Sequence, residues 1–226
     1  MRWIKRRLRG LQEYAERRFL GGALQAVLWR YRHVYKRGWA EGYLNTVDHP
    51  HRPQLVDAVA AFDLVESVME IGCASGANLV CLRARFPSAS LVGLDINAKA
   101  IKVARQHFLD NGDQHVRLIV GEADNLKAIS DNSIDIVVTD AVLMFVTPDR
   151  IRAVLAEITR VACKGLVFNE FHSDGEINGC FYGGRWIYDL VSLIELEVPS
   201  AVISKKKSAF VGGAWDAYGT LVVVRF

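Results

Sequence analysis

Small residues between an apolar segment and a helical segment form the first candidate binding site. The segment is VMEIGCASG, residues 68–76. Glycine permits positive φ angles and close approach of the backbone to a ligand, so Gly72 and Gly76 predict a loop that wraps a bound molecule. A dinucleotide-binding loop has the pattern G-x-G-x-x-G, but here Ala74 occupies the middle position and no third glycine follows. An NAD enzyme is therefore only a minor alternative.

Acidic residues follow the next two predicted strands. Asp95 comes directly after the second strand, where a carboxylate can accept hydrogen bonds from both vicinal hydroxyls of a ribose. Glu122 and Ala123 come after the third strand. Because ligands in open parallel sheets bind beyond the carboxyl ends of the strands, these residues predict one binding crevice beside the glycine loop.

Candidates for acid–base catalysis follow the fourth and fifth predicted strands. They are Asp140, Glu170 and His172, and all three should project from the same edge of the sheet. His172 is best suited to accept a proton near neutral pH, because a free imidazole has a pKa of about 6.5. An exposed loop histidine is the competing interpretation; Glu170 could instead orient the substrate, and Asp140 could contact the cofactor. No ligand spacing demands a metal, so none is predicted.

These side chains require alternating strands and helices to position them. Apolar segments predict strands over 67–71, 90–94, 116–120, 134–139, 165–171, 195–204 and 219–226. Helical spacing predicts helices over 53–62, 76–86, 97–110, 147–161 and 185–194. The pattern favours an α/β fold: a doubly wound, mostly parallel seven-stranded sheet with helices on both faces and an N-terminal helical extension.

The charge distribution separates the chain into a basic extension and an acidic body. Among the 226 residues, 1–37 hold 11 Lys/Arg and 2 Asp/Glu, whereas the remainder has a formal charge of −6. This asymmetry excludes a protein that coats nucleic acid over its whole surface. We predict a basic amphipathic extension over 1–37, a linker and helix covering the cofactor site over 38–66, and a catalytic domain over 67–226.

Four segments of the sequence together resemble class I S-adenosylmethionine-dependent methyltransferases. They are VMEIGCASG, LVGLDINAKAI, VGEADNLKAISDNSIDIVVTDAVLMFV and TPDRIRAVLAEITRV. The resemblance implies a Rossmann-like methyltransferase that binds S-adenosyl-L-methionine. It implies that the cofactor contacts are Glu70, Gly72, Gly76, Asp95, Ile96, Glu122, Ala123 and Asp140. Two positions depart from the family pattern, since glycine is usual where Ala74 stands and aspartate where Glu122 stands.

The sequence defines the methyl acceptor less closely than the cofactor. TDAVLMFV follows the fourth strand in place of the Asn/Asp-Pro-Pro-aromatic motif of adenine-amino methyltransferases, so oxygen or carbon acceptors remain open. The segments YLNTVDHPHR and RWIYDL loosely resemble methyltransferases of bacterial polysaccharide and glycolipid gene clusters. We therefore expect O-methylation of a small molecule or a lipid-linked saccharide. An RNA methyltransferase and a non-catalytic cofactor-binding scaffold are the alternatives.

We predict the cellular location from signals for membrane insertion, secretion and disulfide formation. There is no apolar run of 18 residues, no signal-peptide pattern and no CxxC pair among the four cysteines. We expect a cytoplasmic protein without disulfides. Residues 1–35 carry basic and apolar side chains that suit peripheral contact with the anionic inner membrane surface, although a helix that packs on a partner or on the protein itself explains them equally well.

Overall fold

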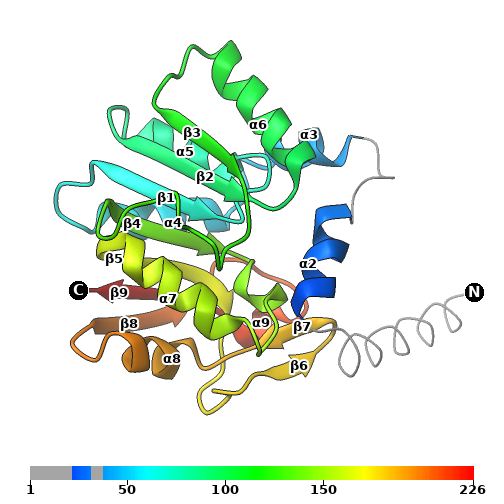
Figure 1. Ribbon diagram of the computed structural model, residues 1–226, viewed down its shortest axis with the longest axis vertical. Helices are drawn as coiled ribbons and strands as arrows, with labels where there is room; N and C mark the ends of the chain where they lie inside the picture. The colour runs from blue at the N-terminus through cyan, green and yellow to red at the C-terminus, as the bar shows by residue number, and fades with distance from the viewer. Residues whose placement is uncertain (1–21, 32–37) are drawn as a thin grey trace, which may run out of the picture.

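The computed structural model of the protein describes residues 22–31 and 38–226 (Figure 1). Most of the predicted basic extension, residues 1–21 and 32–37, lies outside the described residues. The proposed membrane contact of residues 1–35 therefore falls mainly on positions about which the structure says nothing. Within the described ranges, no helix combines the length and the apolar character that a membrane crossing needs.

A seven-stranded sheet forms the centre of the fold. Its strands lie in the order β3-β2-β1-β4-β5-β9-β8. The first five in this order pair in parallel, and β9 pairs antiparallel with both β5 and β8. The strands are β1 (Ser67–Ile71), β2 (Ser90–Asp95), β3 (Val116–Val120), β4 (Ile134–Asp140), β5 (Ala162–Phe171), β8 (Val202–Lys207) and β9 (Gly219–Arg225). The predicted mostly parallel, seven-stranded sheet is confirmed.

Helices cover both faces of this sheet and enclose two apolar cores. One core joins α4 (His51–Ala60), α5 (Ala77–Arg85) and α6 (Ala98–Asp110) to one face. The other joins α7 (Ile151–Val161) and α8 (Leu190–Glu197) to the opposite face. Burial alternates along the strands, so Val68 packs in the first core and Met69 in the second. Every residue of β4 is buried, as expected for a strand at the centre of a doubly covered sheet.

Short helices gather near the carboxyl ends of the parallel strands. They are α2 (Gly22–Tyr31), α3 (Trp39–Leu44), η1 (Leu143–Phe145) and α9 (Trp215–Tyr218). Figure 1 shows α2 beside this edge of the sheet, away from its two covered faces. The elements that close the site therefore come from both ends of the chain and from the loop after β4.

The predicted helix over 185–194 is wrong in its first half. Residues Arg185–Ile187 form β7, which pairs antiparallel with β6 (Cys180–Tyr182). The turn between them contains Gly183 and Gly184, whose φ angles of 58° and 81° favour a hairpin. The helix begins only at Leu190, after Asp189 accepts a hydrogen bond from the Ser192 amide at 3.1 Å.

Three further boundaries differ from the predictions. The segment over 36–53, expected as linker or loop, contains α3 and the start of α4 at His51. The helix expected from residue 147 begins at Ile151, although the Ile151 amide already donates to the Thr147 carbonyl oxygen at 3.0 Å. The strand expected over 195–204 is split, because α8 continues to Glu197 and β8 begins at Val202.

Candidate active site

A cavity of about 680 Å³ opens at the carboxyl ends of β1 to β4. This volume lies within the range of small-molecule and cofactor sites, roughly 300–1,000 Å³. Its walls include Trp29, Trp39, Gly72, Asp95, Glu122 and Asp140. Among the predicted cofactor contacts, Ile96 and Ala123 also line the cavity, whereas Glu70 and Gly76 are not part of its wall.

The glycine loop forms one wall in a left-handed conformation. Gly72, Ala74 and Gly76 have φ angles of 72°, 47° and 85°. A Cβ atom on Gly72 would overlap the Cγ2 methyl of Val142, so only glycine lets β1 turn this close to the loop after β4. Gly76 directly precedes the first residue of α5. Ala74 adopts the same left-handed region despite its Cβ, so the departure from the family pattern leaves the backbone turn in place.

Asp95 extends from the end of β2 to the glycine loop. Its Oδ2 accepts a hydrogen bond from the Ala74 amide at 2.8 Å, and its Oδ1 accepts one from the Asn97 amide at 2.7 Å. Burial raises the pKa of the Asp95 carboxyl, although these two amide bonds oppose the shift. Each carboxylate oxygen can accept a further bond, so the side chain can hold two hydroxyls of a ligand in the cavity.

Glu122 binds two arginines at the opposite wall. Its Oε2 lies 2.6 Å from Nη2 of Arg150, and its Oε1 lies 2.8 Å from Nη2 of Arg30 in α2. Beside this contact, the rings of Trp29 and Phe145 have their centroids 4.3 Å apart. Helix α2 therefore covers the cavity. The segment 38–66, predicted to cover the site, also contributes Gly38, Trp39, Gly42 and Tyr43 to the wall, whereas the part played by α2 was not predicted.

Glu70 lies beneath the cavity and contacts Asp140 through a shared amide. The Asn78 Nδ2 donates to Oε1 of Glu70 at 2.7 Å and to Oδ2 of Asp140 at 2.9 Å. Burial raises the pKa of Glu70 to about 8, and repulsion from Asp140 adds to the shift. At neutral pH Glu70 is therefore a protonated acid beside an ionised Asp140.

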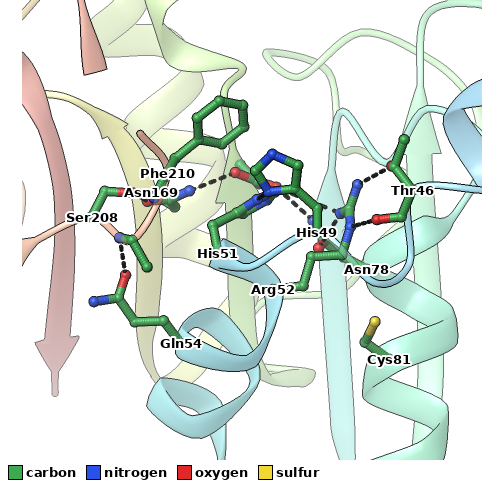
Figure 2. A network of polar contacts seen from close by, with 12 residues as sticks. Thr46, His49, His51, Arg52, Gln54, Asn78, Cys81, Asn169, Ser208 and Phe210 are labelled. Carbon is green, nitrogen blue, oxygen red and sulfur yellow. Dashed lines mark hydrogen bonds and ion pairs between the residues drawn. The ribbon is translucent and has the colours of Figure 1, made fainter. Parts of the chain in front are cut away.

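Asp140 is bonded to the first of two linked histidines that were not predicted from the sequence. Nε2 of His51 lies 2.8 Å from Oδ2 of Asp140, and Nδ1 of His51 lies 2.5 Å from Nδ1 of His49. Figure 2 shows the two imidazole rings side by side at the start of α4. Burial alone would raise the pKa of Asp140, but the hydrogen bonds from His51, Asn78 and Asn169 outweigh it and hold the pKa below its usual value.

A second polar chain holds the other oxygen of Asp140. The Asn169 Nδ2 donates to Oδ1 of Asp140 at 2.7 Å, and the Ser208 hydroxyl donates to Oδ1 of Asn169 at 2.6 Å. Phe210, two residues beyond Ser208, stacks on the His49 imidazole at a centroid distance of 4.6 Å and packs at a tilt against that of His51 at 4.7 Å (Figure 2). The ends of β4 and β5, the loop before α9 and the start of α4 thus meet at one place.

Arg52 is buried behind this network, with only 2% of its surface exposed. Its guanidinium donates to the carbonyl and hydroxyl oxygens of Thr46 at 2.7 and 2.6 Å, and to Oδ1 of Asn78 at 2.5 Å. Its Nη1 lies 3.8 Å from Oδ2 of Asp140. Arg52 therefore holds Asn78 in the orientation in which the Asn78 amide nitrogen faces both carboxyl groups.

Glu170 and His172 lie outside the cavity wall. Glu170 is completely buried and accepts bonds from the amides of Val142 and Met144 at 2.7 and 3.4 Å, so it holds the loop after β4. Burial raises the pKa of Glu170 to about 7. His172 accepts a bond from the Leu190 amide at Nδ1 and lies 3.0 Å from Asp174 at Nε2. Of the three proposed catalytic residues, the structure therefore brings only Asp140 to the cavity.

His172 belongs to a separate polar group with Asp174 and Asp189, whose ligand-type atoms lie within 4.8 Å of one another. Existing contacts already use these atoms. Asp189 accepts bonds from Gly175 and Ser192, and Lys205 forms an ion pair with Asp174. His172 is therefore the centre of a structural network of polar contacts with Asp174 and Leu190.

Comparisons with known proteins agree with this geometry. A family model described as a methyltransferase domain matches residues 68–165, which contain the glycine loop, Asp95, Glu122 and Asp140. Residues 68–165 therefore form a methyltransferase domain. The chain is 33% identical over 110 residues to a trans-aconitate 2-methyltransferase of Rhodococcus jostii, covering 48% of this chain and 39% of that relative. The segments matched in the curated relatives span 17–39% of those proteins.

Solved structures show the same fold at low sequence identity. Magnesium protoporphyrin IX methyltransferase from Synechocystis PCC 6803, solved with bound SAH, superposes with a TM-score of 0.59 at 18% identity. The superposition covers 82% of this chain and 84% of that chain. The N-terminal domain of EvdMO1, solved in the presence of SAH and D-fucose, has a TM-score of 0.59 at 18% identity, covering 78% and 82% of the two chains.

His49, His51, Arg52, Asn78 and Asn169 are the functional candidates that the sequence analysis missed. The first three lie in the run DHPHR, residues 48–52, which the sequence analysis cited only for a loose family resemblance. Two histidines and an arginine within four positions, close before a predicted helix, are a signal that could have identified them. Asn78 and Asn169 carry no such local signal, because their partners are distant in the sequence.

Proposed function

We propose that this protein transfers a methyl group from S-adenosyl-L-methionine to a hydroxyl oxygen of a small molecule or saccharide. The observation that carries the proposal is Asp95, held at the cavity wall by the amides of Ala74 and Asn97. A carboxylate in this position suits the two hydroxyls of a ribose, and the left-handed turn at Gly72 leaves the backbone open toward the same ligand. The cavity volume of about 680 Å³ is sufficient for a nucleoside joined to an amino acid.

An oxygen acceptor is favoured by the loop after β4 and by the relatives. The loop begins with Asp140 and Ala141 and lacks the Asn/Asp-Pro-Pro-aromatic motif of enzymes that act on amino groups of adenine. One matched relative is a ubiquinone biosynthesis O-methyltransferase. A saccharide acceptor is supported by the loose resemblance of the segments YLNTVDHPHR and RWIYDL to methyltransferases of polysaccharide and glycolipid gene clusters. Within this class of acceptors, we propose a lipid-linked saccharide.

Calorimetric titration with S-adenosylmethionine, SAH and NAD tests the cofactor assignment. We expect binding of the first two and none of NAD. Asp95→Ala should weaken S-adenosylmethionine binding by about 10- to 100-fold, since hydrogen bonds to a charged group are worth roughly 1.5–3 kcal/mol. Asp57→Ala is the matched control, because Asp57 is an exposed acid on α4 and should leave the dissociation constant unchanged. Preferential binding of NAD would refute the assignment.

A panel of acceptors then tests the reaction. Methyl-labelled S-adenosylmethionine is incubated with D-fucose, trans-aconitate, catechol, a short RNA, and aqueous and lipid extracts of the source cells. We expect label in a saccharide or lipid-linked saccharide fraction and release of SAH. Label in RNA would favour a nucleic-acid enzyme. Cofactor binding with no label in any fraction would favour a non-catalytic scaffold.

A further inference from the structure

We propose that His49 is the catalytic base of this enzyme and that His51 and Asp140 position it. The inference rests on the proposed methyl transfer and names the group that accepts the hydroxyl proton. Three side chains form the relay: Asp140 at the cavity wall, His51 bonded to it at 2.8 Å, and His49 bonded to His51 at 2.5 Å. His49 is the outermost of them and is only partly buried, whereas His51 has 3% of its surface exposed.

The hydrogen-bond pattern determines which nitrogen of His49 is free. Asp140 is ionised, so Nε2 of His51 must carry the proton in the bond between them. In a neutral His51 the Nδ1 is then an acceptor, and the proton between the two rings must come from Nδ1 of His49. A neutral His49 with its proton on Nδ1 has a lone pair on Nε2. Among the described residues this nitrogen has no hydrogen-bond partner, and it is therefore available as a base.

The charges around His49 favour its neutral form. Partial burial, repulsion from His51 and repulsion from Arg52 lower the pKa of His49, and Asp140 opposes the shift from its place behind His51. A base must be unprotonated before it can act, so this environment prepares His49 at neutral pH. Proton uptake is still stabilised, because the positive charge can move to His51 and pair there with Asp140. Asp140 would thus stabilise an imidazolium in the same way as the carboxylate of a hydrolase triad.

Neighbouring elements hold the relay in place. Asn169, held by Ser208, fixes the second oxygen of Asp140, and Phe210 packs against both imidazoles (Figure 2). Gln54 of α4 accepts a bond from the Ala209 amide at 2.7 Å and donates to the Lys207 carbonyl oxygen at 2.9 Å. The start of α4 and the loop that carries Phe210 are therefore joined on both sides of the two histidines.

The other acid–base candidates are less suitable. Oδ2 of Asp140 already accepts bonds from His51 and Asn78, and its Oδ1 accepts one from Asn169. Glu170 is buried in bonds to two backbone amides, and His172 contacts Leu190 and Asp174 with its two ring nitrogens. His49, like Glu170 and His172, is not part of the cavity wall, but it combines partial exposure, a nitrogen without a partner among the described residues and a bonded path through His51 to Asp140 at that wall.

The balanced step is a single displacement with one proton transfer. When bound, S-adenosylmethionine supplies a methyl group to the acceptor oxygen: the oxygen–carbon bond forms while the carbon–sulfur bond breaks, and its electron pair stays on the sulfur. The hydroxyl proton goes to Nε2 of His49. The Nδ1 proton of His49 moves to Nδ1 of His51, and the resulting imidazolium pairs with Asp140. The proton then leaves to solvent through the partly exposed His49.

Nitrogen NMR of imidazole-labelled protein tests the relay without an acceptor. In the full chain at pH 7.5, we expect His49 with its proton on Nδ1 and His51 with its proton on Nε2. Diethyl pyrocarbonate should then modify His49 before His51, as read by peptide mass spectrometry. In His51→Gln the tautomer preference of His49 should disappear. A neutral His49 that carries its proton on Nε2 in the wild type would overturn the proposal, whatever the protein binds.

Kinetics with an acceptor from the panel separate this inference from the proposed function. His49→Ala should lower kcat by about 100-fold or more, the usual contribution of a general base, while the S-adenosylmethionine dissociation constant changes by less than about twofold. Added imidazole should restore part of the rate, and the fall of wild-type activity at low pH should vanish in the variant. His115→Gln, an exposed histidine before β3, is the control and should keep wild-type turnover.

Two outcomes would contradict the role of His49. Normal kcat in His49→Ala, with cofactor binding and turnover intact, would remove the base and leave the methyltransferase assignment standing. A low kcat that imidazole does not rescue, with an unchanged pH profile, would assign His49 a structural role. Loss of cofactor binding in the wild type would instead refute the proposed function and not the tautomers measured by NMR.

Discussion

The cofactor wall and the histidine network differ in how closely their residues are tied to the strand ends in the sequence. Gly72 directly follows β1, Asp95 is the last residue of β2 and Glu122 lies two residues after β3. In the histidine network, His51 contacts Asp140 across 89 positions, and Ser208 contacts Asn169 across 39. The first is built from local motifs repeated at one sheet edge. The second exists only after α4 and the loop before α9 have packed against that edge.

The difference indicates where changes should be tolerated. A local motif is preserved if its own turn is preserved, whereas a network of distant residues depends on every element that brings them together. Asp140 belongs to both regions, because it lines the cavity and its carboxylate is bonded to His51 and Asn169. Three substitutions test this contrast.

Arg52→Met should have the largest effect on stability. It removes a buried guanidinium, leaves Oδ1 of Asn78 without its donor and takes a positive charge from beside Asp140. Breaking a buried charged network in this way costs about 3–5 kcal/mol. Guanidinium unfolding curves measure the loss. The control is Arg117→Met, an exposed arginine on β3, which should change stability by less than about 0.5 kcal/mol. Equal effects of the two substitutions would show that the network is not rigid.

Gly72→Ala should have the next largest effect and should act on the cofactor wall. The positive φ of 72° costs a non-glycine residue about 1–2 kcal/mol, and the overlap with Val142 adds about 1–3 kcal/mol. Gly112→Ala is the matched control: its φ is 68°, but a Cβ there meets no atom within 4 Å. We expect weaker S-adenosylmethionine binding only in the first variant. The same loss of unfolding free energy in both would mean that Val142 moves freely.

Glu70→Gln should have the smallest effect, and its sign depends on pH. Burial raises the pKa of Glu70 from 4.5 to about 8, so the folded protein keeps a proton that the unfolded chain loses. Wild-type stability should therefore fall as pH rises from about 4.5 to about 8. The variant cannot titrate there, so it should match the wild type below about pH 4.5 and become the more stable of the two as pH rises to about 8.

Thermal melting across pH 5–9 measures this effect. Glu195→Gln, an exposed acid on α8, is the control and should follow the wild-type curve. A parallel fall of stability in wild type and Glu70→Gln would show that Glu70 is ionised in the folded protein.

Most of the sheet could be predicted from the sequence because each strand carries its own signal. The apolar runs at 116–120 and 134–139 correspond to β3 and, apart from one added residue, to β4. The hairpin of β6 and β7 was missed because the run RWIYDL has the apolar spacing of a helix. Gly183 and Gly184, together with the bond from the Tyr188 hydroxyl to the Val146 carbonyl oxygen, decide otherwise.

The sequence by itself indicated a methyltransferase domain, the positions of most strands along the chain and an acid, Asp95, at the cavity wall, because those depend on residues within a few positions of a strand end. The tertiary structure alone decided which side chains meet Asp140. His172 follows a strand of the correct edge, yet its nitrogens turn to Leu190 and Asp174. His49 and His51 lie outside the sheet and reach Asp140 because α4 packs across the strand ends. Contacts between distant segments depend on packing, and packing leaves no pattern in the local sequence.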